Sequence, residues 1–209
     1  MSAQHPYAAH DLIFTLMPNL NSKVVLDVGC GKGVYGYLMR SDKGGDKAYL
    51  IGIDIHPPRL MFLKKYLVYD ELIRASADWL PFRDNCANFI FASEVIEHLP
   101  KARGLILLKE TERICNGKVM ITTPNGFLPT PAPSTQYETH WSSWKTCEFK
   151  KLGYTVYGYG FKWARHVNPY IGKLFRYIFT PISFKMTLLS EFLIAVKQVQ
   201  TYPKSTFIV

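Results

Sequence analysis

A short apolar segment that runs directly into three closely spaced glycines is the feature that most restricts how this chain can fold. The segment Lys23–Val28 is largely apolar, and Gly29, Gly31 and Gly33 follow it. Glycines permit a tight turn and let the backbone approach a ligand closely. The pattern predicts a buried strand over Lys23–Val28, a ligand-binding turn, and a helix over Gly33–Arg40.

The spacing of these glycines argues against a dinucleotide site. A dinucleotide-binding turn requires its third glycine at position 34, where this chain has Val34, and the third glycine here is Gly33. Asp27 also lies at the end of the predicted strand, where a carboxylate would repel a pyrophosphate. An anionic group at that place favours a cationic ligand, such as one that carries an ammonium and a sulfonium.

Segments of strand character and of helix character alternate along the first two thirds of the chain. This alternation predicts an α/β fold, with a parallel sheet covered by helices on both faces. Ligands of such sheets bind at the carboxyl ends of the strands. We see no repeat and no second domain, and we expect one domain over residues 1–209. The predicted strands are Lys23–Val28, Ala48–Ile53, Leu72–Ala75, Phe89–Ala92, Lys118–Thr122, Tyr154–Gly158 and Phe192–Lys197, and the further helices are Arg59–Tyr69 and Ile96–Cys115.

The strand and its glycines resemble the first motif of the class I S-adenosylmethionine-dependent methyltransferases, which reads hydrophobic-D-x-G-x-G-x-G. Within that class the chain is most similar to methyltransferases of type 11 and to ubiquinone O-methyltransferases. The resemblance covers roughly residues 20–199. It implies a Rossmann-like, doubly wound sheet of seven strands that is mostly parallel, with an antiparallel last strand. It also implies S-adenosylmethionine as the methyl donor and S-adenosylhomocysteine as the product.

Further positions match the cofactor-binding motifs of this class in the same order. Asp54 ends the second predicted strand, where a carboxylate can accept hydrogen bonds from both ribose hydroxyls. Asp78 corresponds to the family residue that accepts a hydrogen bond from the adenine amino group. Each acid taken alone could equally be a strand-end or turn carboxylate. The resemblance implies a cofactor site formed by Asp27, Gly29, Gly31, Gly33, Asp54, Ile55, Asp78, Trp79, Ser93 and Glu94.

A cluster of acids and a histidine follows the fourth predicted strand. If Glu94 opens a helix, then Glu94, Glu97 and His98 lie on one helix face, at spacings of three and four residues. That face would point to the place where the acceptor meets the cofactor. A loop over 126–139, rich in proline, separates this cluster from His140.

Two groups of methyltransferases share this E-x-x-E-H arrangement. One is the ubiquinone type, and the other is the small-RNA 3′-terminal 2′-O-methyltransferases of the Hen1 type, which hold a divalent ion with two glutamates and two histidines. The second resemblance implies a possible metal site at Glu94, Glu97, His98 and His140, which suits Mg²⁺ or Mn²⁺. Without a metal, His98 or His140 is the candidate general base and Glu94 a further candidate catalytic residue. The acids could also serve only to complement a helix dipole.

The net charge indicates which partners are favoured, and the cysteines bear on a zinc site. A formal net charge of +9 favours anionic partners such as RNA or a membrane surface, or else serves only to keep the protein in solution. The four cysteines form no C-x-x-C pair, which argues against a zinc site. The N-terminus has no signal-peptide pattern, so we expect a cytoplasmic protein with free thiols. The oligomeric state stays open.

An insert over 162–189 separates the last two predicted strands and is rich in aromatic and basic residues. Asn168 and Pro169 predict a helix start, and apolar residues then recur at helical spacing. This helix could pack on the core, cover the substrate, or lie on a membrane.

The resemblance therefore predicts a methyltransferase that acts on a small-molecule acceptor, lipid-like compounds included. One alternative is a metal-dependent RNA 2′-O-methyltransferase of the Hen1 type. The other is a protein that binds the cofactor or a partner without catalysis.

Overall fold

The computed structural model describes residues 7–130, 133, 135–165 and 167–199. Its centre is a seven-stranded sheet in the order β3-β2-β1-β4-β5-β7-β6. Strands β1 to β5 are parallel, and β7 runs antiparallel to both β5 and β6. The predicted fold class, including the antiparallel last strand, is confirmed. The strands are β1 Val24–Val28, β2 Tyr49–Asp54, β3 Glu71–Arg74, β4 Ala87–Ser93, β5 Cys115–Pro124, β6 Thr155–Tyr159 and β7 Phe192–Gln198.

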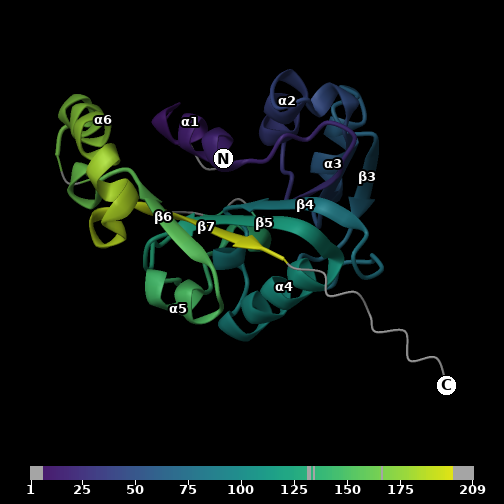
Figure 1. The fold of residues 1–209 in the computed structure, drawn as a ribbon. Coiled ribbons are helices and arrows are strands. Elements are labelled where there is room, and N and C mark those ends of the chain that lie inside the picture. Colours follow the sequence, from purple (N-terminus) through teal and green to yellow (C-terminus); the bar gives the residue numbers. More distant parts are fainter. Residues whose placement is uncertain (1–6, 131–132, 134, 166, 200–209) are drawn as a thin grey trace.

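Helices cover both faces of this sheet, as Figure 1 shows. Helices α1, α2 and α3 lie on one face, and α4 and α5 lie on the other. Alternate residues of the strands therefore belong to two separate hydrophobic clusters: Val25 packs with α1 to α3, and Leu26 packs with α4 and α5. The helices are α1 Tyr7–Leu16, α2 Val34–Ser41, α3 Pro57–Leu63, α4 Lys101–Ile114, α5 Thr146–Lys151 and α6 Pro169–Lys185.

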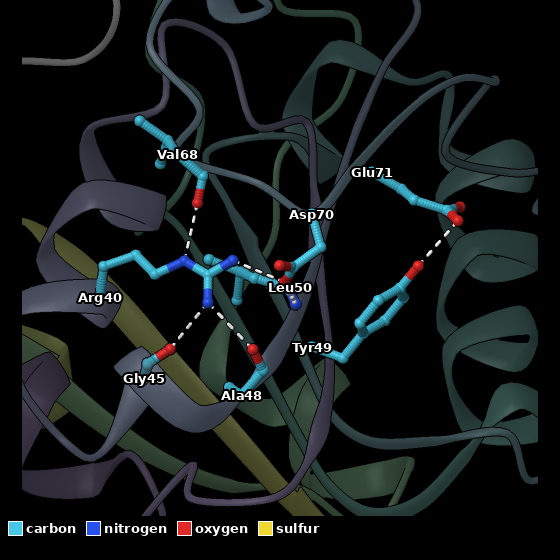
Figure 2. A network of polar contacts seen from close by, with 8 residues as sticks. All are labelled: Arg40, Gly45, Ala48, Tyr49, Leu50, Val68, Asp70 and Glu71. Carbon is cyan, nitrogen blue, oxygen red and sulfur yellow. Dashed lines mark hydrogen bonds and ion pairs between the residues drawn. The ribbon is translucent and has the colours of Figure 1, made fainter.

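Arg40, near the end of α2, joins three segments of the chain (Figure 2). Its guanidinium donates to the backbone oxygens of Gly45, Ala48 and Val68 at 2.8–2.9 Å. It also pairs with Asp70 at 2.5 Å. These bonds connect the helix after the glycine turn to the start of β2 and to the segment before β3. They therefore fix the position of α2, which begins directly after that turn.

The predicted helix over Ile96–Cys115 was wrong at both ends. Residues Ile96–His98 form a short 3-10 turn, α4 begins only at Lys101, and Cys115 is the first residue of β5. The break lies at Pro100, because a proline disfavours helical backbone in the residue before it, and Leu99 is extended.

The insert between β6 and β7 contains α6, flanked by the 3-10 segments Lys162–Arg165 and Thr187–Leu189. The predicted helix start is confirmed, since the Asn168 side chain accepts a hydrogen bond from the Tyr170 backbone N–H at 3.0 Å. No helix in the described part of the chain is both long and apolar enough to cross a membrane.

Candidate active site

The glycine turn lies where the strand order reverses, between β1 and β4, which is the usual ligand crevice of an open α/β sheet. Gly29, Gly31 and Gly33 all have φ between 56° and 78°, a region that other residues adopt rarely. A Cβ on Gly29 would lie 2.3 Å from a side-chain carbon of Val95. A Cβ on Gly31 would instead meet no atom closer than 3.9 Å. Space for a ligand therefore remains above Gly31.

Asp54 holds this turn in place from the end of β2. Its carboxylate accepts hydrogen bonds from the backbone N–H groups of Gly31, at 2.9 Å, and His56, at 2.8 Å. The side chain is buried, and Arg59 lies 3.7 Å from it. Each carboxylate oxygen has a second lone pair, so Asp54 can also accept from a ligand hydroxyl.

Asp27 is a second buried acid beneath the same turn. Burial raises its pKa to about 7, the Tyr69 hydroxyl opposes this by donating a hydrogen bond at 2.5 Å, and the charge of Asp54 adds to the rise. Among the described residues Asp27 has no ion-pair partner. Two buried carboxylates beside open space make this turn an anionic environment, which suits a cationic ligand.

Asp78 lies at the same edge of the sheet, but its carboxylate is bound by protein groups. Arg103 of α4 donates to both oxygens and the Ser76 hydroxyl donates to one of them. Desolvation acts to raise the pKa of Asp78, but these hydrogen bonds hold it below its usual range. A contact from Asp78 to adenine therefore requires Arg103 to share the carboxylate. The exposed Trp79 lines a neighbouring cavity of about 290 Å³.

Glu97, His98 and His140 come together beyond the carboxyl end of β4. One possible ligand atom from each residue lies within 4.8 Å of the others, and the two imidazole rings are 4.7 Å apart. The loop after residue 126 positions His140 here, because the backbone N–H groups of Trp141 and Ser142 donate to the Glu97 carbonyl oxygen. Residues more than 40 positions apart in sequence thus form one polar cluster.

Both histidines are held neutral. Burial and the neighbouring His140 lower the pKa of His98 to about 4, and burial also lowers the pKa of His140. Nδ1 of His98 lies 3.2 Å from the Thr139 carbonyl oxygen, and Nδ1 of His140 lies 2.5 Å from that of Leu128. A carbonyl oxygen can only accept, so we assign the ring proton to Nδ1 in each case. Both Nε2 atoms are then lone-pair donors, able to take a proton or bind a metal.

Glu97 supplies the acidic member of this cluster. It is buried, and its Oε2 accepts a hydrogen bond from the Thr123 hydroxyl at 3.0 Å. Its Oε1 is buried with no hydrogen-bond partner in the described part of the chain. Burial raises the pKa of Glu97 to about 7. A buried oxygen without a donor is a place where a cation or a substrate hydroxyl would gain a strong interaction.

The predicted helix face of Glu94, Glu97 and His98 does not exist. Glu94 has a φ of 53° and lies in a turn, not at the start of a helix. Its side chain accepts from the Thr122 hydroxyl at 3.0 Å, on the side where Ser93 also meets Thr122. The group that could hold a metal is therefore Glu97, His98 and His140, without Glu94.

Four residues that no motif indicated connect the loop after residue 126 to the segment that follows β2. Arg59 pairs with Glu138 at 2.8 Å and also faces Asp54, while Tyr137 packs edge-on against His56. These contacts form between segments about 80 residues apart, so the sequence pattern alone contains no signal for them.

Comparisons with known proteins agree on the kind of domain. Residues 26–121 match the family model described as "Methyltransferase domain". A tRNA U34 carboxymethyltransferase of Aliarcobacter butzleri is 34% identical over 114 residues, which are 50% of this chain and 35% of that protein. The chain thus aligns with about a third of the length of this curated relative.

Solved structures of methyltransferases share the fold at low sequence identity. The putative methyltransferase in a complex with the Trm112 activator of Haloferax volcanii superposes with a TM-score of 0.67, at 16% identity, and covers 95% of this chain and 91% of that one. A phosphoethanolamine N-methyltransferase of Haemonchus contortus with S-adenosyl-L-methionine gives 0.62, at 16% identity, over 93% of this chain and 52% of that one. At such identities the likeness establishes the fold.

Proposed function

We propose that this chain is a class I S-adenosylmethionine-dependent methyltransferase, which transfers the methyl group of S-adenosylmethionine to an acceptor held beside Glu97, His98 and His140. The observation that supports this most strongly is the glycine turn, which leaves open space above Gly31 and whose backbone is bound by the buried carboxylate of Asp54. S-adenosylmethionine carries an ammonium and a sulfonium, and both match that anionic surrounding.

In this proposal the bound cofactor supplies a methyl group that its sulfonium already activates. Asp54 binds the ribose hydroxyls, and Ile55, Asp78 and Trp79 surround the adenine. Asp27, Ser93 and Glu94 lie toward the methionine end. The protein then contributes mainly by placing the acceptor in line with the methyl group, which can supply several kcal/mol of the barrier.

The histidines are the proposed general bases. As the acceptor atom forms its bond to the methyl carbon and the bond from carbon to sulfur breaks, the proton of the acceptor passes to Nε2 of His98 or His140. The low pKa of His98 makes it a weak base, and His140 is less buried. We therefore assign the proton transfer to His140 and a positioning role to His98.

The same cluster fits a divalent cation. The cluster offers two neutral imidazoles and a buried carboxylate with one oxygen that accepts no hydrogen bond. Such a donor set is typical of Mn²⁺, Fe²⁺ or Zn²⁺ sites and binds Mg²⁺ more weakly. A bound ion would lower the pKa of an acceptor hydroxyl. Glu97, His98 and His140 would hold it.

The acceptor class that we propose is a small molecule, lipid-like compounds included. RNA is the second candidate, favoured by the net charge of +9 and by the similarity to a tRNA U34 carboxymethyltransferase. That relative is a longer protein, of which this chain matches 35%, so an RNA acceptor is a hypothesis for this chain.

The first experiment measures cofactor binding by calorimetry. We expect S-adenosylmethionine and S-adenosylhomocysteine to bind to the wild type, and Asp54→Asn to bind at least tenfold more weakly because it loses ribose contacts. The exposed Asp46→Asn variant should match the wild type. Absence of binding to the wild type at high micromolar ligand would refute the proposed donor.

The second experiment identifies the acceptor. Labelled methyl donor is incubated with cell extract separated into lipid, RNA, protein and small-metabolite pools. Label in the lipid or metabolite pool that His140→Gln abolishes, while cofactor binding persists, supports the primary proposal, and label in RNA supports the second. Binding without label in any pool favours a non-catalytic protein. Titration of Mn²⁺ into wild type and Glu97→Gln tests the metal, and equal binding to both would exclude this cluster.

A further inference from the structure

Helix α6 presents an apolar face to solvent as well as an apolar face to the protein. Phe175 and Phe179 pack with Phe161, and Phe184 stacks on Tyr157 of β6 at 4.7 Å between ring centroids. This side buries the helix against the sheet. The residues that point away from the protein are exposed and apolar or aromatic: Tyr170, Ile171, Leu174, Tyr177, Ile178 and Ile182.

These six residues, the outer face of α6, form one continuous stripe. At 100° per residue they fall within a single arc of the helical wheel, and the packed phenylalanines lie beyond its edge. Tyr170 and Tyr177 are 81% and 77% exposed, so both side chains are almost fully accessible to solvent. Met186 and Leu188 extend the exposed apolar surface past the end of the helix. Contiguous apolar surface of this kind marks an interaction site.

The charges of the chain segment that contains the outer face have one sign. No Asp or Glu occurs in the sequence between Glu148 and Glu191, whereas lysines and arginines recur throughout. Lys173 and Lys185 are exposed on α6 itself. Glu191 is buried and paired with Arg176 at 2.8 Å, so it adds no negative charge beside the face.

The outer face also lies at the edge of the sheet that bears the candidate active site. Helix α6 connects the end of β6 to the start of β7, and Phe192 of β7 pairs with Pro124, the last residue of β5. Asn125 then donates to the backbone oxygen of Thr187 at 2.7 Å, just after α6. Figure 1 places α6 at one end of the molecule, beside β6 and on the same side of the sheet as α1.

We propose that the outer face of α6 binds the surface of an anionic membrane, with the helix lying in the plane of the interface. Aliphatic side chains enter the headgroup region, tyrosines sit at the boundary between water and hydrocarbon, and lysines contact anionic headgroups. The helix does not span the bilayer. The absence of acids favours this occupant over a protein partner, because an anionic surface attracts every exposed charge of the helix. Because α6 joins β6 to β7 at the sheet edge of the candidate active site, binding in this way would place the membrane contact at that end of the molecule.

The test is sedimentation of the whole protein, without cofactor, with vesicles of phosphatidylcholine alone or mixed in equal parts with phosphatidylglycerol. We expect at least tenfold stronger binding to the mixed vesicles, and weakening by salt. The double variant Leu174→Asp, Ile178→Asp should lose binding at least tenfold. Its control is Ile106→Asp on α4, since Ile106 is 46% exposed and Ile178 is 51% exposed. Lys173→Gln with Lys185→Gln should weaken binding to the mixed vesicles roughly thirtyfold and leave binding to phosphatidylcholine unchanged.

Circular dichroism and thermal unfolding show whether each variant is folded, so that a loss of vesicle binding is not mistaken for unfolding. Cofactor binding, measured for each variant, shows whether the proposed methyltransferase site is intact. Fluorescence of Trp163, which is exposed beside α6, should shift to the blue with mixed vesicles and not in Trp163→Phe. The proposal is overturned if the wild type stays in solution with mixed vesicles, or if the folded double variant still sediments. Loss of RNA binding by that variant, without vesicle binding by the wild type, would also overturn it.

Discussion

Replacing Asp27 by asparagine should make the ligand-free protein more stable above pH 7 and weaken cofactor binding. Asp27 is buried with a pKa of about 7, against 3.8 for the ordinary side chain. Below about pH 4 the carboxyl group is protonated in both the folded and the unfolded state. Between pH 4 and pH 7 the folded state keeps a proton that the unfolded state releases, so the free energy of unfolding falls as the pH rises.

The size of this effect follows from the shift of about three pKa units, which costs about 4 kcal/mol once the pH exceeds 7. Asparagine removes the charge, and its oxygen can still accept from the Tyr69 hydroxyl. Its amide N–H groups need acceptors, and a buried donor without one costs about 1–3 kcal/mol. We therefore expect a net gain of about 2 kcal/mol for Asp27→Asn at pH 8.

Urea unfolding from pH 5 to pH 8.5 measures this directly. As the pH rises, Asp27→Asn should lose less stability than the wild type, and the difference between the two proteins is the contribution of Asp27. Glu97, whose pKa is raised, and the histidines His98 and His140, whose pKa values are lowered, add slopes of opposite sign to both proteins and cancel in that difference. The exposed Asp46→Asn variant serves as control and should follow the wild type. Cofactor affinity of Asp27→Asn should fall at least tenfold. If this variant is less stable than wild type at pH 8 and has the same pH slope, the reasoning fails.

Two further substitutions test the frame of the turn. Gly29→Ala should lower the free energy of unfolding by at least about 1–2 kcal/mol and abolish cofactor binding, because it adds backbone strain at positive φ and a Cβ 2.3 Å from Val95. The control is Gly126→Ala, which has a φ of 94° but no atom within 4 Å of the added Cβ, so it should show the backbone strain alone. Binding by Gly29→Ala at wild-type affinity would contradict this. Arg40→Met should lower the free energy of unfolding by about 2–3 kcal/mol, since it deprives three backbone oxygens of a charged donor, whereas the exposed Arg83→Met should change it by less than about 0.5 kcal/mol. An equal decrease in the free energy of unfolding for Arg40→Met and Arg83→Met would show that the hydrogen bonds of Arg40 do not contribute to stability.

The candidate active site contains two buried acids whose charged forms cost stability. Buried Asp27 and Glu97 both have pKa values raised to about 7 by burial, so each disfavours its charged form in the ligand-free protein. A cation placed beside either group relieves that cost. The cofactor would supply positive charge at the first, and a metal ion or an acceptor proton at the second. Perturbed acids in a crevice are typical of functional sites for this reason.

Local sequence determined the strands and the glycine turn. Strand β1 and its glycines were predictable because continuous burial and positive φ leave direct traces in residue type. The Asn168 cap of α6 was predictable for the same reason, since a cap needs one side chain and its neighbours. The seven-stranded sheet with its antiparallel last strand followed from the resemblance to a family whose fold is shared.

Tertiary structure alone decided the acceptor side. The helix predicted from Glu94 failed because Pro100 and the left-handed turn at Glu94 override the spacing pattern. His140 contacts His98 only because the intervening loop folds back on the 3-10 turn. The outer face of α6 is exposed because the helix packs against β6 with its other residues. Such contacts join distant segments, and their energy depends on the whole fold. No short window of sequence can contain them.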